Sequence, residues 1–139
     1  MKLDWAMLAN AADGKDGLAY ILGGGWDTTW RDVYPSPFIG SVVFRVLFTP
    51  EETAAVHHAQ LRIVDDQRGL IAPAINFPVP LSIPPGHPEG WDVGGLVGVT
   101  LTGLEIPKAG SYAIEIAVDN TTLTLLRFRC VEGPPPAGR

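Results

Sequence analysis

The sequence predicts an all-β protein: a single antiparallel β-sandwich of seven or eight strands that spans residues 1–131. Short segments with alternating apolar and polar residues recur about every ten residues, which is typical of a sandwich. Glycine (16 residues) and proline (13) make up about a fifth of the 139 residues and divide the chain into pieces too short for long helices. Hydrophobic residues form 46% of the chain, enough for one core.

The first half of the chain contains the most regular alternation. Strands are predicted over residues 3–10, 18–24, 41–49 and 59–65. The turn-rich AADGKDG between the first two favours a hairpin. In TPEETAAVHH, Thr49 can cap a helix and Pro50 suits the first helical position, so one helical turn is expected there.

The second half begins with a proline-rich stretch and ends with a hairpin. Residues 73–88 carry too many prolines for a central strand, so they are expected to form an edge strand or a crossover. Strands follow over 96–106 and 111–119, and NTTLTLLRFRCV closes the last hairpin. Residues 132–139, EGPPPAGR, are expected to be a disordered tail.

Composition and charge argue against several classes of protein. The net charge is −5 and no three basic residues are consecutive, which argues against a nucleic-acid binder. No stretch approaches the roughly 18 apolar residues of a membrane span, and the N-terminus does not have the pattern of a signal peptide. Cys130 is the single cysteine, in agreement with a reducing compartment. A cytoplasmic protein without a membrane or nucleic-acid partner is expected.

Two resemblances refine the fold. IPKAGSYAIEIAVD resembles the G-x-Y segment of immunoglobulin-like sandwiches, which implies that the Tyr112 hydroxyl bonds back to the preceding turn as a tyrosine corner. Over most of its length the chain also resembles a family of small, uncharacterised bacterial proteins, on KLDWAMLAN, GGGWDT and HHAQLRIVDDQRG. That resemblance implies a β-sandwich and a bacterial source, and it carries over no catalytic residue.

The triple glycine at residues 23–25 invites comparison with phosphate-binding loops. Gly23, Gly24 and Gly25 match neither G-x-x-x-x-G-K-[ST] nor G-x-G-x-x-G, and no lysine is near. Glycines also permit a bulge or sharp bend, so the favoured interpretation is structural: the strand bends here and changes sheets.

Two tryptophans follow the glycines and offer a binding hypothesis. Trp26 and Trp30 share a face if the segment is extended, and Asp27 and Asp32 beside them supply hydrogen-bonding groups. Such an arrangement is suitable for stacking on sugar rings. Tryptophans with a large apolar body are also common in cores and subunit contacts. Carbohydrate or small-ligand binding through these four residues is therefore the alternative to a purely structural role.

Residues for catalysis or metal binding are not arranged in a recognisable pattern. His57 and His58 are adjacent and would point to opposite faces of a strand, and no Cys/His ligand spacing occurs. Cys130 lies beside apolar residues on the last strand and is expected to be buried. No G-x-S-x-G motif is present. We therefore expect no enzyme, no cofactor and no metal.

Residues 41–49 are apolar on both faces of the strand. Val43 and Leu47 lie on the face opposite Phe44, with Arg45 between them. A two-layer sandwich covers only one face, so the other needs a second subunit or the proline-rich segment 73–88 as cover. Low charge (18%) and a mean hydropathy of +0.16 favour the subunit. The sequence thus predicts a structural or protein-interaction module that self-associates, most simply as a dimer, with an unidentified protein partner as a further possibility.

Overall fold

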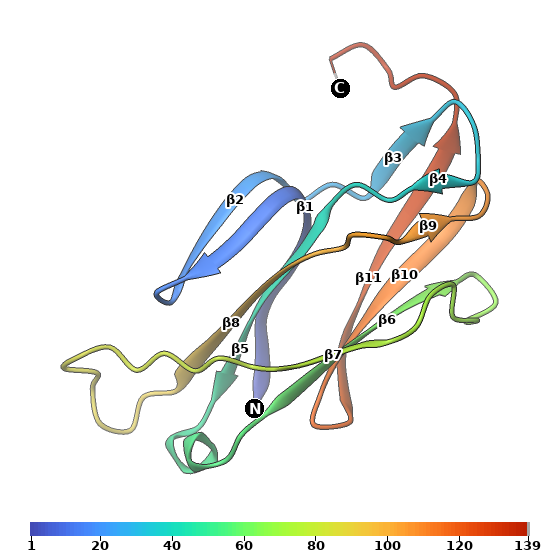
Figure 1. Cartoon of the computed structure of the whole chain (residues 1–139). Coiled ribbons are helices and arrows are strands. Elements are labelled where there is room, and N and C mark those ends of the chain that lie inside the picture. The colour runs from blue at the N-terminus through green and yellow to red at the C-terminus, as the bar shows by residue number, and fades with distance from the viewer. Residues whose placement is uncertain (139) are drawn as a thin grey trace.

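The computed structural model describes residues 1–138, which form an all-β fold (Figure 1). The described residues contain one short 3-10 helix, η1 (Pro50–Ala54), at the predicted helical turn, where Glu52 and Thr49 form a capping box. The strands are β1 (Lys2–Lys15), β2 (Leu18–Gly24), β3 (Thr28–Arg31), β4 (Ser36–Pro37), β5 (Ser41–Phe48), β6 (His58–Asp65), β7 (Ile75–Pro78), β8 (Val93–Thr100), β9 (Glu105–Ile106), β10 (Gly110–Val118) and β11 (Thr121–Glu132).

The strands form three sheets. One has the order β2-β1-β5-β8, the second has the order β3-β11-β10-β6-β7, and the third is the pair β4-β9. The prediction of seven or eight strands is wrong, because β3, β4, β7 and β9 are too short to show alternation in the sequence. The prediction of a purely antiparallel fold is also wrong at one place: β3 runs parallel to β11 at the edge of the five-stranded sheet.

Side chains from both larger sheets meet in one core. The four-stranded sheet contributes Phe44 and Phe48, and the five-stranded sheet contributes Ile63, Ile114 and Ile116. These residues recur every second position along β5, β6 and β10, which is the periodicity that places them on one face. The predicted strand alternation is thus the pattern that builds the core.

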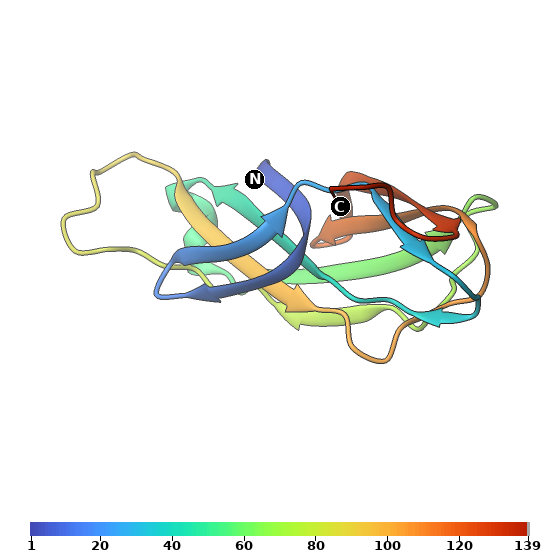
Figure 2. The same cartoon turned by 90° about the horizontal axis from the view of Figure 1, so that it is seen from above.

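The opposite face of β5 is also buried, and its cover is the β1–β2 hairpin. Val43 is 0% exposed. The distal half of the hairpin folds back across β8: a Cβ added to Gly98 would lie 3.2 Å from the Gly14 nitrogen, and one added to Gly14 would lie 3.5 Å from Leu96. Figure 2 shows the hairpin, in blue, crossing β8, in yellow to orange. The missing side chains of Gly14 and Gly98 allow this close approach.

The proline-rich segment is both an edge strand and a crossover. β7 pairs with β6 at the edge of the five-stranded sheet. The chain then passes to the other sheet, where Leu81 bridges Gly95 of β8 and Val79 joins the core. The segment therefore closes one side of the core, and the alternative in which it covers Val43 in place of a second subunit is wrong.

The triple glycine lies where the chain leaves one sheet for the other. β2 belongs to the four-stranded sheet and β3 to the five-stranded sheet. Gly23 and Gly25 have φ values of 61° and 89°, which are unfavourable for residues with a Cβ. The Gly25 amide donates to the Leu8 carbonyl oxygen at 2.7 Å, which fixes the bend against β1. This is the conformation that the structural interpretation of the glycines predicts.

The predicted tail overlaps the last strand. Glu132 is the final residue of β11, and the Gly133 amide donates to the Arg31 carbonyl oxygen at 2.9 Å. Arg139 lies outside the described residues. The disorder predicted for residues 132–139 stays a prediction for the part beyond Gly133.

Tyr112 has the geometry that its G-x-Y context predicts. Its ring is buried and packs on Phe128, with the ring centroids 5.7 Å apart. Its hydroxyl donates to the Lys108 carbonyl oxygen at 2.6 Å, in the turn before β10. We predict that Tyr112→Phe lowers the free energy of unfolding by about 1–3 kcal/mol, because the partly buried hydrogen bond to the Lys108 carbonyl oxygen is lost. Urea unfolding measures this loss, and an unchanged midpoint would show that water replaces the hydroxyl.

The position of Val43 leads to a prediction about folding. Val43→Asp should lower the free energy of unfolding by ~3 kcal/mol or more, since it places a carboxylate between the sheet and the hairpin. Leu47→Asp is the matched control on the same face, at a partly exposed position, and should cost less. Thermal unfolding of the two variants measures the difference. If Val43→Asp folds as stably as Leu47→Asp, the hairpin does not cover this face.

Candidate functional site

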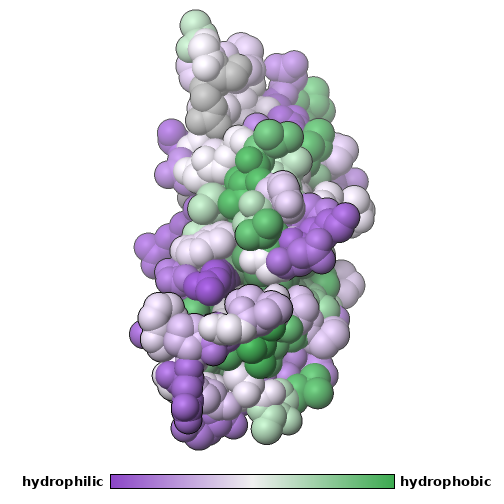
Figure 3. Space-filling model, turned by 90° about the vertical axis from the view of Figure 1, so that its left-hand side faces the viewer, coloured by the Kyte–Doolittle hydropathy of each residue, from purple (hydrophilic) through white to green (hydrophobic). Residues whose placement is uncertain are grey.

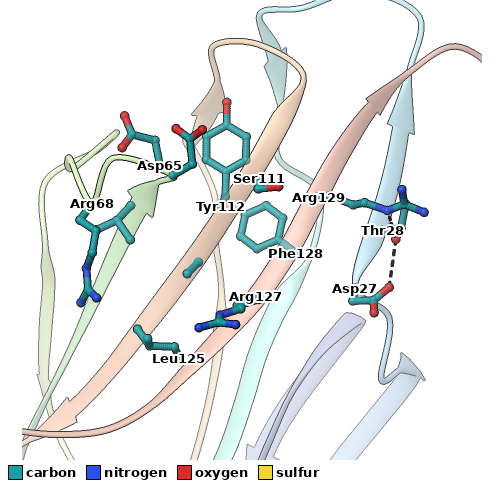
Figure 4. Close-up of a pocket in the computed structure, with 13 residues that line it drawn as sticks. Asp27, Thr28, Asp65, Arg68, Ser111, Tyr112, Leu125, Arg127, Phe128 and Arg129 are labelled. Carbon is teal, nitrogen blue, oxygen red and sulfur yellow. Dashed lines mark hydrogen bonds between the residues drawn. The ribbon is translucent and has the colours of Figure 1, made fainter.

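A hollow with a volume of about 400 Å³ lies on the five-stranded sheet (Figure 4). Strands β3, β6, β10 and β11 and the turn after β6 form it. Its lining residues are Asp27, Thr28, Val64, Asp65, Asp66, Arg68, Ser111, Tyr112, Ala113, Leu125, Arg127, Phe128 and Arg129.

The hollow is on the face of the sheet that points away from the core. Tyr112 and Phe128 belong to the core cluster, so the residues next to them in β10 and β11 point outward. Ser111 pairs with Arg129 and Ala113 pairs with Arg127 in the strand register. The small side chains of β10 therefore form a low floor between β6 and β11, and longer side chains form the walls.

The two walls carry opposite charges. Arg127 and Arg129 extend from β11 on one side, and Asp65 lies at the end of β6 on the other (Figure 4). Asp66, the next residue in the chain, also lines the hollow. Arg129 is held in place because its Nε donates to Thr28 Oγ1 at 3.1 Å. Asp65 Oδ1 accepts the amides of Gln67 and Gly69, both at 2.9 Å, so this carboxylate also shapes the turn.

A buried carboxylate adjoins the hollow and orders its rim. Glu115 is 5% exposed, and it accepts from Arg62 Nη1 at 2.9 Å and from Arg68 Nη2 at 2.7 Å. Both of its oxygens are therefore paired with guanidinium groups, which compensates for burial of the charge. The Arg68–Glu115 ion pair holds the Arg68 side chain at the edge of the hollow, with its guanidinium group against Glu115.

Of the four residues predicted to bind a ligand, the structure places only Asp27 in the hollow. Trp26 turns inward: its ring lies 5.9 Å from that of Phe38, next to the core. Trp30 is in β3 and Asp32 follows it, and neither lines the hollow. Because the Trp26 ring packs beside the core, it does not form an open stacking surface together with Trp30.

The three residues predicted to form an interface have partners within the chain. Val43 is fully buried beneath the hairpin, and Leu47 is partly buried. Arg45 forms an ion pair with Asp4 of β1, with an Nη1–Oδ2 distance of 2.6 Å. A contact between subunits through Val43 would require the hairpin to move away.

A second group of titratable residues surrounds His57. The His57 ring is buried and stacks on Phe48 with the centroids 4.2 Å apart. Nδ1 donates to Asp119 Oδ2 at 2.5 Å, and Nε2 donates to the Glu52 carbonyl oxygen at 2.6 Å. Because both nitrogens face acceptors, the ring is held doubly protonated. The hydrogen bond to Asp119 raises the pKa of His57, and the same bond lowers the pKa of Asp119.

Cys130 is a buried residue of the last strand, as predicted. Burial raises the pKa of its thiol to about 11, so the thiol is protonated at neutral pH. Within residues 1–138, no three His, Cys, Asp or Glu side chains lie close enough together to hold a metal ion. Those residues also contain no helix of the length and apolarity needed to cross a membrane.

Comparison with known proteins identifies a family. A model of DUF6941, a family of unknown function, matches residues 4–131. The chain belongs to DUF6941. No curated protein and no solved structure matches it. Membership agrees with the predicted relation to a family of uncharacterised proteins, and the matched residues of this DUF6941 protein include both the hairpin and the hollow.

The lining of the hollow could be recognised only in part from the sequence. In LLRFRC, Arg127 and Arg129 alternate with apolar residues, which is the signal for two arginines on the outer face of a strand. Asp65 and Asp66 begin DDQRG, a composition typical of a turn, and Asp65 has that role. Their position opposite the arginines depends on the strand order β11-β10-β6, which the local pattern does not encode.

We predict that the His57–Asp119 pair makes stability depend on pH. Raising the pKa of His57 stabilises the fold below the ordinary histidine pKa, and this contribution is lost as pH rises through the raised value. The lowered pKa of Asp119 stabilises the fold above the ordinary aspartate pKa, and this contribution is lost in acid. Urea unfolding should therefore show a loss of about 1 kcal/mol between pH 6 and pH 9, since Asp119 is 40% exposed.

The adjacent histidine provides the control for this measurement. His57→Gln should remove the loss above pH 6, whereas His58→Gln, at an exposed position, should keep it. A loss that persists in His57→Gln would assign the pH dependence to another group.

Proposed function

We propose that this DUF6941 protein is a non-enzymatic interaction module that self-associates through the exposed edge of strand β2. The observation that carries the proposal is a row of three large apolar side chains on a strand whose outer edge is unpaired. Leu18, Tyr20 and Leu22 are 59%, 57% and 72% exposed. They alternate along β2 and therefore share one face.

The row follows from the way the hairpin packs. Ala12, Gly14, Ala19 and Ile21 are on the side of the hairpin that faces the sheet, as the Gly14–Leu96 approach shows. The small residues let the hairpin lie close to β8. The alternation then leaves the larger residues of β2 on the outer side, where the described chain has no further layer to cover them.

Strand β2 lacks the features that protect an edge from association. It is the terminal strand of its sheet, and LAYILGG contains no charged residue and no proline. Natural edge strands are commonly protected by lysine, proline or a bulge. Figure 3 shows hydrophobic residues, in green, gathered along the side of the molecule that bears the hairpin and the crossover loop. Exposed Ile83 and Trp91 belong to that loop, and its Ser82 lies next to Gly17 at the hairpin tip.

The hairpin register favours a second copy as the occupant. Asp16 and Gly17 form a two-residue turn with positive φ, so Leu18, Tyr20 and Leu22 exchange hydrogen bonds with β1. The amide and carbonyl groups of Ala19 and Ile21 consequently point outward. Two antiparallel copies of β2 could pair Ala19 with Ile21 around a two-fold axis at Tyr20. Leu18 of each copy would then face Leu22 of the other.

We propose a non-enzymatic role because of the state of two side chains that could otherwise take part in catalysis. Cys130, the single thiol, is buried and protonated, and both nitrogens of His57 are engaged with acceptors. Neither is available as a nucleophile or a base in this conformation. The sugar-binding alternative through Trp26 and Trp30 has less support, because the Trp26 ring packs beside the core.

The proposal includes an immunoglobulin-like fold and a bacterial, cytoplasmic origin. The bond from Tyr112 to Lys108 and the common core of the two larger sheets support the fold relation. The single cysteine supports a reducing compartment. The bacterial source rests on the sequence resemblance alone.

The test is the mass in solution of the parent and of a charged variant. Light scattering at micromolar concentration should give twice 14.9 kDa, about 30 kDa, for the parent. The double variant Leu18→Lys, Leu22→Lys should be a monomer, since lysines at a strand edge oppose pairing. The midpoint of its thermal unfolding should equal that of the parent monomer, since both side chains are exposed.

Val56→Lys is the matched control, because Val56 is 73% exposed and lies outside β2, between η1 and β6. This variant should remain a dimer. A parent that is monomeric at 100 µM, or a Val56→Lys variant that dissociates as readily as the double variant, would overturn the role of β2.

A further inference from the structure

We infer that the hollow on the five-stranded sheet binds a small zwitterion of the dipeptide class, with its carboxylate at Arg127 and its ammonium at Asp66. The inference concerns a surface that the self-association of β2 does not use, and it rests on the charges, the shape and the free groups of the hollow.

The first observation is which charged groups are already engaged. Arg68 is paired with Glu115, and Arg129 donates to Thr28. Asp65 accepts amides of its own turn, and Asp27 accepts the Thr28 hydroxyl at 2.9 Å. The side chains of Arg127 and Asp66 make no hydrogen bond or ion pair within the described residues, and Arg127 pairs with Ala113 through its backbone alone. The hollow therefore offers one unengaged guanidinium and one unengaged carboxylate.

The second observation is that these two groups are on opposite walls. Arg127 is on β11 and Asp66 follows β6, with β10 between the two strands. In the strand register Arg127 lies across from Ala113, whereas Asp66 follows the partner of Tyr112, so the two positions are also offset by two residues along the strands. Two strand spacings of roughly 9.5 Å and an offset of about 7 Å place their backbones roughly 12 Å apart. The two side chains extend over part of that distance, and an extended dipeptide of about 7 Å spans the remainder, whereas a single α-amino acid covers only about half as much.

The third observation is the shape between the walls. Ser111 and Ala113 form the floor, and their small side chains leave space for a backbone with small side chains. The Ser111 hydroxyl offers a further hydrogen bond. Val64 and Leu125 add apolar contact at the sides. A volume of about 400 Å³ is within the range of sites for small molecules, roughly 300–1,000 Å³.

The balance of charge favours a zwitterion over an anion. Three arginines (68, 127 and 129) and three aspartates (27, 65 and 66) line the hollow, so the ionised side chains sum to zero. A polyanion such as phosphate would meet the aspartates of the opposite wall at close range. A ligand that carries both charges satisfies both walls at once, and guanidinium and carboxylate form strong charge-assisted hydrogen bonds.

The experiment is a titration of the full chain with dialanine, monitored by backbone amide resonances in NMR. Dialanine should shift resonances of residues 64–69, 111–113 and 125–129 with a dissociation constant below about 1 mM. N-acetyl-dialanine and dialanine amide, each of which lacks one charge, should bind at least tenfold more weakly.

Variants at the two walls assign the ends of the ligand. Arg127→Gln should make dialanine and its amide bind equally, and Asp66→Asn should do the same for dialanine and its N-acetyl derivative. Both side chains are exposed, so the fold should persist, which thermal unfolding verifies. Lys15→Gln and Asp32→Asn change exposed charges away from the hollow and should leave binding unchanged.

Three results would overturn the inference. Dialanine at 10 mM could leave these resonances in place, inorganic phosphate could bind more tightly than dialanine, or N-acetyl-dialanine amide, which lacks both charges, could bind as well as dialanine. The monomeric Leu18→Lys, Leu22→Lys variant should still bind dialanine, which separates this site from the proposed association surface.

Discussion

Burial of strand β5 on both faces is the constraint on which the rest of the structure depends. The five-stranded sheet covers one face, and Phe44 and Phe48 join the common core there. The other face, with Val43, needs a separate cover, and the chain supplies it by folding its own β1–β2 hairpin back across the sheet. Two consequences follow. β1 must be long enough to serve both layers, and the hairpin must contain residues as small as Gly14 where it meets Gly98.

The parts of this fold that the sequence predicts are the parts that local chemistry decides. The alternation in LAYILGG and the Asp-Gly turn before it define β2 and its hairpin, because side-chain period and turn conformation are properties of neighbouring residues. Tyr112 was predictable for the same reason, since its partner is only four residues away. The packing of the hairpin over Val43 could not be predicted. Apolar residues on both faces of a strand indicate that both faces are buried, but they do not indicate which segment covers each face.

The candidate site was less predictable than the fold. The sequence suggested Trp26 as a ligand-binding residue, but its large apolar ring packs beside the core, as its size favours. The hollow instead joins Arg127 to Asp66 through three strands that are distant in sequence. The alternation of side chains along each strand indicates that Arg127 and Asp66 face outward. The strand order brings them to the same hollow. Sequence therefore identifies the exposed charges and leaves their grouping to tertiary structure.

The layers of the molecule place the two proposed surfaces on opposite sides. The hairpin covers the outer face of the four-stranded sheet, and the hollow is on the outer face of the five-stranded sheet, with the core between them. Association through β2 would leave the hollow of each copy open. A two-fold axis at Tyr20 would then present two identical hollows in a fixed relative orientation, so a partner with two matching ends would gain from simultaneous binding at both. Because Leu22 and Arg127 belong to different sheets, the energetic effects of changing them should add, and any departure from additivity would reveal coupling through the core.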